Sequence, residues 1–249
     1  VSRGQITYHE FVHKFGFYDS VATSLTTIWS QGGIYSYLSA ASTLYISSSS
    51  TDDTVAGTGA RTVTVSGLDN NFDFKVETVS LNGQTGVELN GSTWFRVNRI
   101  VVNTAGSGGG NAGVLYVGTE ATPSSGVPTN KYATVAIGDN QTLMALWTVP
   151  AGYTAYFLAG SVSLGTANIN QYLTARLISR LSGGVFRTQQ KVTLEGGSFQ
   201  QNYEIPLEFP EKTDIEARAV SSGSNNAVSA TFDIIYIKNS SVDLNNYSP

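Results

Sequence analysis

The sequence predicts an all-β protein, built mainly as an antiparallel β-sandwich of jelly-roll type with a short, partly helical N-terminal arm. Three observations favour this class. Apolar and polar residues alternate over many short runs, turn residues separate the runs, and no convincing helical pattern lies between them. A chain of 249 residues is long enough for one large β domain or two smaller ones.

The composition changes along the chain and suggests four segments. A polar stretch that contains Pro123 and Pro128 marks the boundary between two β regions. We therefore predict an N-terminal anchoring arm at 1–45, a β-meander region at 46–120, a jelly-roll-like β-sandwich domain at 121–240 and a tail at 241–249.

The arm carries apolar residues at helical spacing. Its first cluster, at positions i, i+3, i+4 and i+7, is Tyr8, Phe11, Val12 and Phe15. A second cluster repeats this spacing and ends at Gly32-Gly33, which favours two short helices. Because so short a segment cannot bury an aromatic face by itself, we expect it to anchor on a neighbouring surface. The expected anchors are Phe11, Phe15, Phe17, Ile28 and Trp29.

The stretch from Gly59 to Val102 alternates in the manner of a β-meander. Asn82-Gly83 and Asn90-Gly91 match the two-residue type I′ turn, in which both central residues take positive φ. We therefore expect Asn82-Gly83 to join adjacent antiparallel strands. A β-bulge is expected near Glu77, where the alternation changes parity.

The second half contains further runs of β-branched and aromatic residues, separated by turn residues. A hairpin turn is expected between Leu181 and Val185. The predicted strands are Tyr172 to Leu181, Val185 to Leu194, Tyr203 to Phe209, Asp214 to Val220 and Val228 to Ile237.

Charge and composition narrow the function. The net charge is −4 and no run of basic residues breaks the pattern, so we expect no nucleic-acid partner. The chain has no cysteine, which excludes disulfides and thiolate chemistry. No apolar run approaches a membrane span and no signal-peptide core is visible, so we expect a soluble chain that does not insert into a membrane.

Three patterns resemble metal or phosphate sites. His9-Glu10-Phe11-Val12-His13 matches H-E-x-x-H, which on a helix could bind zinc and place Glu10 as the base of a metalloprotease. However, the motif begins at residue 9 and no helical third ligand follows it. Gly106 to Gly113 is rich in glycine, as phosphate-binding loops are. We predict a hairpin loop instead, because a nucleotide loop needs a strand before it and a helix after it, and here strands are expected on both sides.

The turn at Asp69, Asn71 and Asp73 has the alternate spacing of a calcium loop, but it lacks the loop's glycine and bidentate glutamate. We read it as a polar turn. We predict no catalytic residues, no cofactor and no metal site.

Several runs resemble virion structural proteins of tailed bacteriophages. They include Lys14-Phe15-Gly16, Thr58-Gly59-Ala60-Arg61-Thr62-Val63, Glu77-Thr78-Val79-Ser80-Leu81-Asn82-Gly83, Phe95-Arg96-Val97 and Glu211-Lys212-Thr213-Asp214-Ile215. The resemblance spans most of the chain and consists mainly of glycine turns and strand residues. It implies a non-enzymatic particle component of the capsid decoration (cement) or tail accessory type.

The function is stated as a first hypothesis with two alternatives. Our first hypothesis is a homotrimeric decoration protein on the capsid surface of the virion, with the major capsid protein and copies of itself as partners. The alternative is a tail or fibre component that binds a host surface glycan through the loops Gly106 to Gly113 and Ser221 to Asn226. The remote alternative is a zinc metalloprotease that uses His9, Glu10 and His13.

Overall fold

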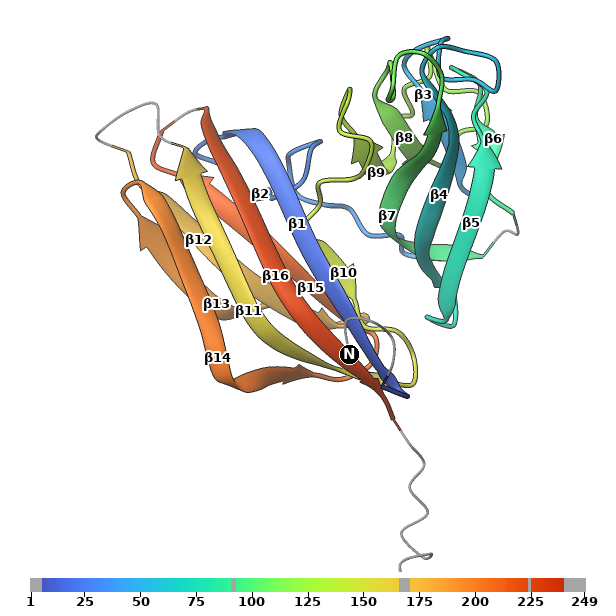
Figure 1. Ribbon diagram of the computed structural model, residues 1–249. Coiled ribbons are helices and arrows are strands. Elements are labelled where there is room, and N and C mark those ends of the chain that lie inside the picture. The colour runs from blue at the N-terminus through green and yellow to red at the C-terminus, as the bar shows by residue number, and fades with distance from the viewer. Residues whose placement is uncertain (1–5, 91–92, 166–170, 224, 240–249) are drawn as a thin grey trace, which may run out of the picture.

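Two β-sandwiches lie side by side in the computed structural model of the chain (Figure 1). The structure describes residues 6–90, 93–165, 171–223 and 225–239. Within these ranges all regular elements are β-strands, numbered β1 to β16, and no helix is present. The predicted tail at 241–249 and Gly91 of the second Asn-Gly pair lie outside the described residues.

The first sandwich contains the first and last strands of the chain, β1 and β16, and is called the jelly-roll sandwich. One of its sheets has the order β1 (His9–Val21), β16 (Asn226–Lys238), β11 (Tyr153–Gly165) and β14 (Gly197–Phe209). The other has the order β10 (Leu146–Thr148), β15 (Thr213–Ser221), β12 (Leu173–Leu181) and β13 (Arg187–Leu194), with β2 (Thr26–Thr27) beside β15.

The strand order is that of a jelly roll. With the eight main strands counted along the chain from β1, the sheets read 1-8-3-6 and 2-7-4-5, and every pairing is antiparallel. This is the arrangement of two interleaved Greek keys. The core between the sheets contains Trp147, Phe157, Phe232 and Ile234, all buried. The predicted all-β sandwich is therefore confirmed.

The second sandwich, called the inserted sandwich, is formed by the chain between β2 and β10. One sheet has the order β6 (Val87–Glu88), β3 (Tyr45–Ser48), β8 (Leu115–Gly118) and β9 (Lys131–Val135). The other has the order β5 (Phe74–Ser80), β4 (Ala60–Asp69) and β7 (Trp94–Ala105). Trp94, Ile100 and Leu115 are fully buried between them.

The chain leaves and re-enters the jelly-roll sandwich at neighbouring points. Trp29 and Met144 form a β-bridge, and Ala145 N donates to Ile28 O at 2.9 Å. The strands therefore group by sheet, with β1, β2 and β10 to β16 in one sandwich and β3 to β9 in the other. This grouping cuts across the segments 1–45, 46–120 and 121–240.

The predicted helical arm is wrong, because residues 9–21 form β1. This strand pairs with β16 from His9↔Ile237 to Val21↔Asn226. Apolar side chains occupy both faces of the strand: Val12 and Tyr18 pack against the core, and Phe11 and Phe17 point outward. Apolar residues on both faces of a strand can mimic helical spacing over seven residues.

Gly16 allows β1 to approach two neighbouring backbone segments closely. A Cβ atom at Gly16 would lie 2.2 Å from Ile28 O and 2.4 Å from Ala145 N. The backbone of β1 therefore passes close to the point where the inserted segment leaves and returns. The second predicted helix is replaced by β2 and a turn in which Gly32 and Gly33 take φ of 68° and 69°.

The predicted hairpin at Asn82-Gly83 is also wrong. Gly83 has the expected positive φ of 58°, but Asn82 bridges Thr54 and the following strand, β6, pairs with β3. The β4–β5 hairpin instead turns at 69–73, where the Asp69 carboxylate accepts from Asn71 N at 2.8 Å and Asp73 N at 3.0 Å. Local hydrogen bonds of an Asx turn thus determine this hairpin.

The expected bulge near Glu77 is absent from the β4–β5 pair. That pair keeps one register from Thr62↔Ser80 to Leu68↔Phe74. The irregularities lie on the other edge of β4, where it pairs with β7. The change of parity in the sequence arises because Val76 is exposed while Val79 packs against the core.

Candidate functional site: the junction between the two sandwiches

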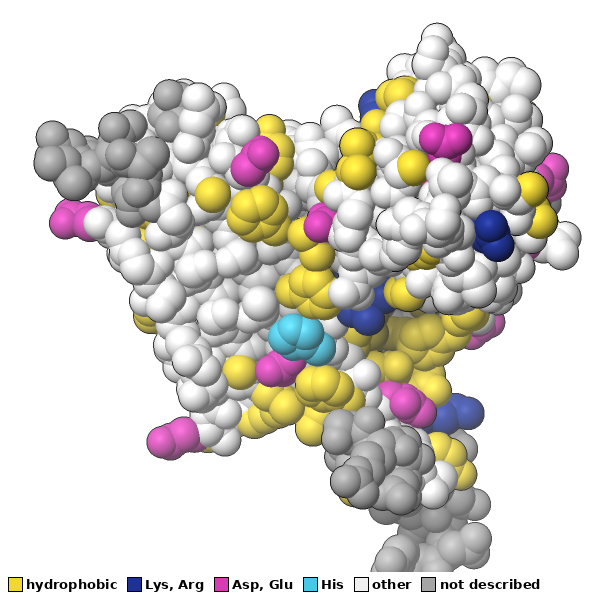
Figure 2. All heavy atoms as spheres, turned by 45° about the horizontal axis from the view of Figure 1, so that its top comes forward, with side chains coloured by type: hydrophobic (Ala, Val, Ile, Leu, Met, Phe, Trp, Pro, Cys, Tyr) yellow, Lys and Arg dark blue, Asp and Glu magenta, His cyan; other side chains and the backbone are white. Residues whose placement is uncertain are grey.

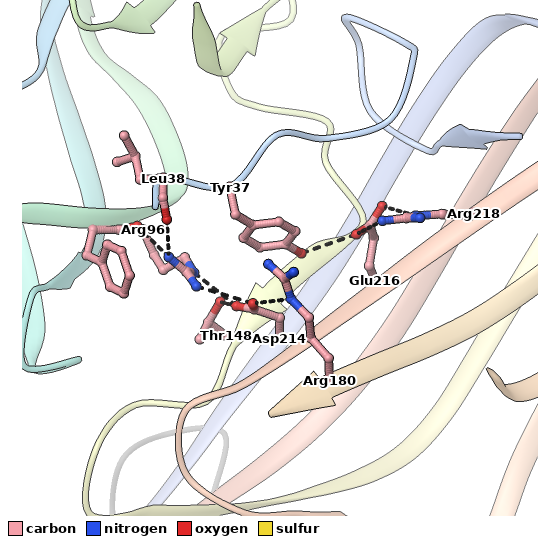
Figure 3. A network of polar contacts seen from close by, with 9 residues as sticks. Tyr37, Leu38, Arg96, Thr148, Arg180, Asp214, Glu216 and Arg218 are labelled. Atoms are coloured by element: carbon pink, nitrogen blue, oxygen red, sulfur yellow. Dashed lines mark hydrogen bonds and ion pairs between the residues drawn. The ribbon is translucent and has the colours of Figure 1, made fainter. Parts of the chain in front are cut away.

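Buried charged side chains gather where the two sandwiches meet (Figure 3). Asp214 and Glu216 are two residues apart on β15 and therefore share one face of the strand. Both carboxylates point out of the jelly-roll core toward the inserted sandwich. Both residues are fully buried. A buried carboxylate is costly unless it is paired and hydrogen-bonded, so the surrounding side chains decide whether this junction is stable.

Asp214 connects the two sandwiches directly. Arg96, on β7 of the inserted sandwich, donates to both of its carboxylate oxygens, at 2.9 Å from Nε and 3.2 Å from Nη2 (Figure 3). Arg180 Nε donates at 3.0 Å and Thr148 Oγ1 at 2.6 Å. The two-point contact with Arg96 fixes orientation as well as distance.

Glu216 organises the segment that links the sandwiches. Arg218 donates to its two oxygens at 2.7 and 3.0 Å, and Tyr37 Oη donates at 3.2 Å. Thr27 Oγ1 also donates to this carboxylate. Tyr37 lies in the segment that leaves the jelly-roll sandwich, so Glu216 holds that segment against β15.

Aromatic rings fill the space between the arginines. The Arg96 guanidinium lies 4.2 Å from the Phe95 ring and 5.0 Å from the Tyr37 ring. Arg180 lies 4.6 Å from Tyr37 and 4.4 Å from the Phe186 ring. Arginine stacks on aromatic faces in this way because it is weakly hydrated and planar, so the rings cover the guanidinium groups while their charges remain paired.

Burial raises the pKa of Tyr37 well above its ordinary value, and the neighbouring Glu216 and Asp214 carboxylates raise it further. Burial likewise raises the pKa of Tyr35, whose hydroxyl donates to Tyr132 O at 2.9 Å. Both phenols therefore stay neutral over the physiological range and act as hydrogen-bond donors.

A second contact joins β1 to β7. Lys14 is buried, and its Nζ donates to Asn98 O at 2.5 Å. Arg99 Nη2 donates to His13 O at 2.8 Å, and its guanidinium lies 5.8 Å from the Phe15 ring. Burial lowers the pKa of Lys14 well below its ordinary value, and the nearby Arg99 lowers it further.

These contacts make the junction a structural site. The Asp214 and Glu216 carboxylates each accept several hydrogen bonds, so neither has a free lone pair turned to solvent. The consequence of the arrangement is mechanical, because it fixes the orientation of one sandwich relative to the other.

The five predicted anchors do not form one surface. Phe11 and Phe17 are 39% and 40% exposed on the outer face of β1. Phe15 is half-buried beneath Arg99. Ile28 belongs to the jelly-roll core and Trp29 to the core of the inserted sandwich.

The H-E-x-x-H pattern lies on β1 rather than on a helix. Residues four apart on a strand are ~13 Å apart along the chain, so His9 and His13 cannot bind one ion in the manner of a zinc helix. His13 Nδ1 lies 2.6 Å from Asp233 Oδ1. No group of three His, Cys, Asp or Glu residues in the described ranges is placed to hold a metal ion.

The remaining patterns have structural partners. In the glycine-rich loop, Gly106 N donates to Gly59 O and Gly108 N to Thr58 O, both at 2.8 Å. Among the hollows lined by described residues, three measure about 60, 210 and 260 Å³, whereas ligand pockets generally measure ~300 Å³ or more. In the part of the chain that the structure covers, no helix is long and apolar enough to cross a membrane.

Arg96 and Asp214 both lie in runs that the sequence analysis singled out, but their contact with each other was not predicted. Arg96 lies in Phe95-Arg96-Val97 and Asp214 in Glu211-Lys212-Thr213-Asp214-Ile215, two of the runs that carry the family resemblance. A charged residue at a buried position of an apolar strand was the available signal. Its partner, 118 residues away, was not deducible from spacing.

A search of protein families and a search of curated proteins found no match to this sequence. Solved structures with some likeness include the infectious bursal disease virus VP2 subviral particle, at 11% identity and a TM-score of 0.27 over 93% of this chain and 72% of that one. Another is the structure of the Gx strain of infectious bursal disease virus, which is 12% identical with a TM-score of 0.24 over 94% of this chain and 77% of that one.

The Yersinia pseudotuberculosis-derived mitogen is similar to 40% of this chain and 90% of its own, at 10% identity and a TM-score of 0.19. Superpositions with TM-scores below 0.5 do not establish a common fold. The jelly-roll assignment therefore rests on the strand order of this chain.

Proposed function

We propose that this chain is a non-enzymatic structural protein of a virion, a capsid decoration (cement) protein that stabilises the shell. Its partners are the major capsid protein and copies of itself in a homotrimer. The observation that carries the proposal is a jelly roll to which a second sandwich is fixed by buried, fully paired charges. Viral capsids and lectins use the jelly-roll architecture, which is an analogy of fold.

The surface of the jelly-roll sandwich suits protein contact. On the outer face of its β1-β16-β11-β14 sheet, hydroxyl side chains pair across strands, with Ser161–Thr231 at 2.7 Å and Ser163–Ser229 at 2.5 Å. Phe11 and Phe17 are exposed at the β1 edge. Figure 2 shows few, scattered charged side chains on the face in view, and hydrophobic ones near the meeting of the sandwiches.

The area of this face is sufficient for a stable contact. Four strands of up to thirteen residues cover ~800 Å², from the usual strand spacing and rise per residue. A standard protein interface buries ~800 Å² on each partner. The rigid junction would transmit a contact on this face to the inserted sandwich without a hinge.

The test is the location and stoichiometry of the protein in the particle. Imaging of particles with this chain labelled is expected to show it on the capsid surface in icosahedral copy number. A handful of copies at one vertex or along the tail would instead support the alternative, a tail or fibre component that binds a host glycan.

A binding assay with purified particles and chain tests the surface. Phe11→Ser with Phe17→Ser is expected to reduce occupancy of the particle at least ~10-fold, because aromatic anchors contribute most of an interface's energy. Val76→Ser is the matched control and is expected to bind like the wild type, since Val76 is also highly exposed but lies on β5 of the inserted sandwich. Equal occupancy for all three proteins would contradict the assignment of this face.

A further inference from the structure

The hairpin formed by β12 and β13 concentrates positive charge in an acidic protein. Residues 173–194 contain four basic residues and no acidic one, whereas the chain as a whole has a net charge of −4. The four are Arg176, Arg180, Arg187 and Lys191. They are spread over two strands, which is why no basic run is visible in the sequence.

Three cations line up across this sheet. Arg176 on β12 lies directly opposite Arg218 on β15 and directly opposite Lys191 on β13. Side chains at directly opposed positions have Cβ atoms ~4.5–5.5 Å apart, and like charges placed there are destabilising. A row of three cations therefore needs negative charge nearby.

Only one of the three cations has a negatively charged partner among the described residues. Arg218 is paired with Glu216 at 2.7 and 3.0 Å (Figure 3). Among the described residues, Arg176 and Lys191 make no ion pair and no hydrogen bond through their side chains. Two positive charges at the centre and edge of the row thus remain without a counter-charge.

Arg176 is the informative member. Its Nε is buried and has no hydrogen-bond partner, although a buried donor without a partner costs free energy. Lys191 alone would be explained as a charge that protects the open edge of β13 from further pairing. That explanation does not extend to a guanidinium in the middle of the sheet.

We propose that Arg176 and Lys191, with Arg218 behind them, form a binding site for a doubly charged tetrahedral oxyanion of the sulfate or phosphate class. Such an ion matches the two uncompensated charges. Its oxygens can accept from the Arg176 fork and from the Lys191 ammonium at once. The Thr174–Thr193 hydroxyl pair, in the next row of the sheet, supplies further donors.

The test is a titration of the full chain with sodium sulfate, followed by calorimetry and by thermal unfolding. Sodium chloride at equal ionic strength is the reference, because sulfate also stabilises proteins non-specifically. We expect saturable sulfate binding that is at least ~10-fold weaker in Arg176→Gln and in Lys191→Gln, since each loses a charge-assisted contact. Lys238→Gln, the same charge change on an exposed residue of β16, is expected to bind like the wild type.

A second readout separates a binding site from a structural arginine. In low-salt buffer without sulfate, Arg176→Gln is expected to unfold at a higher temperature than the wild type, because it removes a like-charge row. No saturable binding, or equal sulfate affinity in wild type, Arg176→Gln and Lys191→Gln, would overturn the proposal. Acetate binding as tight as sulfate binding would overturn the assignment to a doubly charged oxyanion.

Discussion

Asp214 illustrates how a single buried carboxylate can decide the geometry of a protein. It is fully buried, and its two oxygens accept from Arg96, Arg180 and Thr148. Removal of one member of such a set leaves the others charged and desolvated, which costs more than the lost contact itself. The residue is therefore more important for holding the sandwiches in place than for adding net stability.

Asp214→Ala is expected to lower the free energy of unfolding by about 3–5 kcal/mol, because Arg96 and Arg180 would keep buried charges without a counter-charge. Urea denaturation of the full chain measures this change. Asp139→Ala, which removes an exposed carboxylate from the inserted sandwich, is expected to change stability by less than about 0.5 kcal/mol.

A double variant tests the reason. Asp214→Leu combined with Arg96→Met replaces the pair by apolar groups and is expected to recover more than half of the loss, because only Arg180, which is partly exposed, is then left without its counter-charge. If the double variant were less stable than Asp214→Ala, the explanation by uncompensated charge would be incorrect.

Lys14 predicts a pH dependence of stability. Its pKa is lowered in the folded protein, so between that lowered pKa and the ordinary 10.5 the unfolded chain binds more protons than the folded one. Stability contributed by this group therefore rises with pH through that window and is lost as pH falls through the folded pKa.

Lys14→Met is expected to flatten this rise and to make the protein more stable than the wild type at neutral pH. Chemical denaturation at a series of pH values up to 10 measures it. Lys238→Met is the control, since Lys238 is exposed at the end of β16. A wild-type stability that does not rise with pH relative to Lys14→Met would contradict the buried-amine explanation.

At the scale of elements, β1 is an integral strand of the jelly-roll sandwich. Gly16→Ala is expected to lower the free energy of unfolding by about 2–4 kcal/mol, because its Cβ would meet Ile28 O and Ala145 N at 2.2 and 2.4 Å. Gly165→Ala is the matched control, since its Cβ would lie 3.6 Å from the nearest atom, at the end of another strand. Thermal unfolding of both variants decides the point, and equal melting temperatures would show that β1 can shift away.

Elements of the second half were predictable because their signal is local. Alternating apolar residues predicted strands near 172–181, 185–194 and 214–220, and the structure has β12, β13 and β15 there. The helix predicted at residues 9–21 was wrong because β1 carries apolar side chains on both faces, and this pattern imitates helical spacing over seven residues. The hairpin predicted at Asn82-Gly83 was wrong because a positive φ at Gly83 defines a turn but does not determine which strands pair on either side of it.

At the scale of the whole molecule, the topology depends on contacts that spacing cannot reveal. β1 pairs with β16 across more than two hundred residues, and Arg96 meets Asp214 across 118. The position of the insertion, between Trp29 and Met144, leaves no composition change at either point. The sequence therefore predicted an all-β antiparallel sandwich and several of its strands, but neither the insertion nor the junction.

The junction predicts that the two sandwiches unfold together. They share β10, in which Leu146 packs into the inserted core, Trp147 packs into the jelly-roll core and Thr148 donates to Asp214. Calorimetry of the wild type is therefore expected to show one transition, although the chain contains two cores. Arg96→Ala is expected to split it in two, because the charged contact between the sandwiches is removed while each core stays intact.

Arg61→Ala is the matched control for that experiment. Arg61 lies in the same inserted sandwich and donates from Nε to Gly57 O at 3.1 Å, within its own sandwich. It is expected to lower the melting temperature while preserving a single transition, since its contact does not cross the junction. Two transitions in the wild type would show that the sandwiches are not coupled, and a split in Arg61→Ala as large as in Arg96→Ala would show that the effect is not specific to the junction. A single transition in Arg96→Ala would show that β10 and the contacts of Lys14 and Arg99 couple the sandwiches without Arg96. One transition in the wild type and two in Arg96→Ala would make the buried arginine–carboxylate pair the source of the cooperativity between the sandwiches.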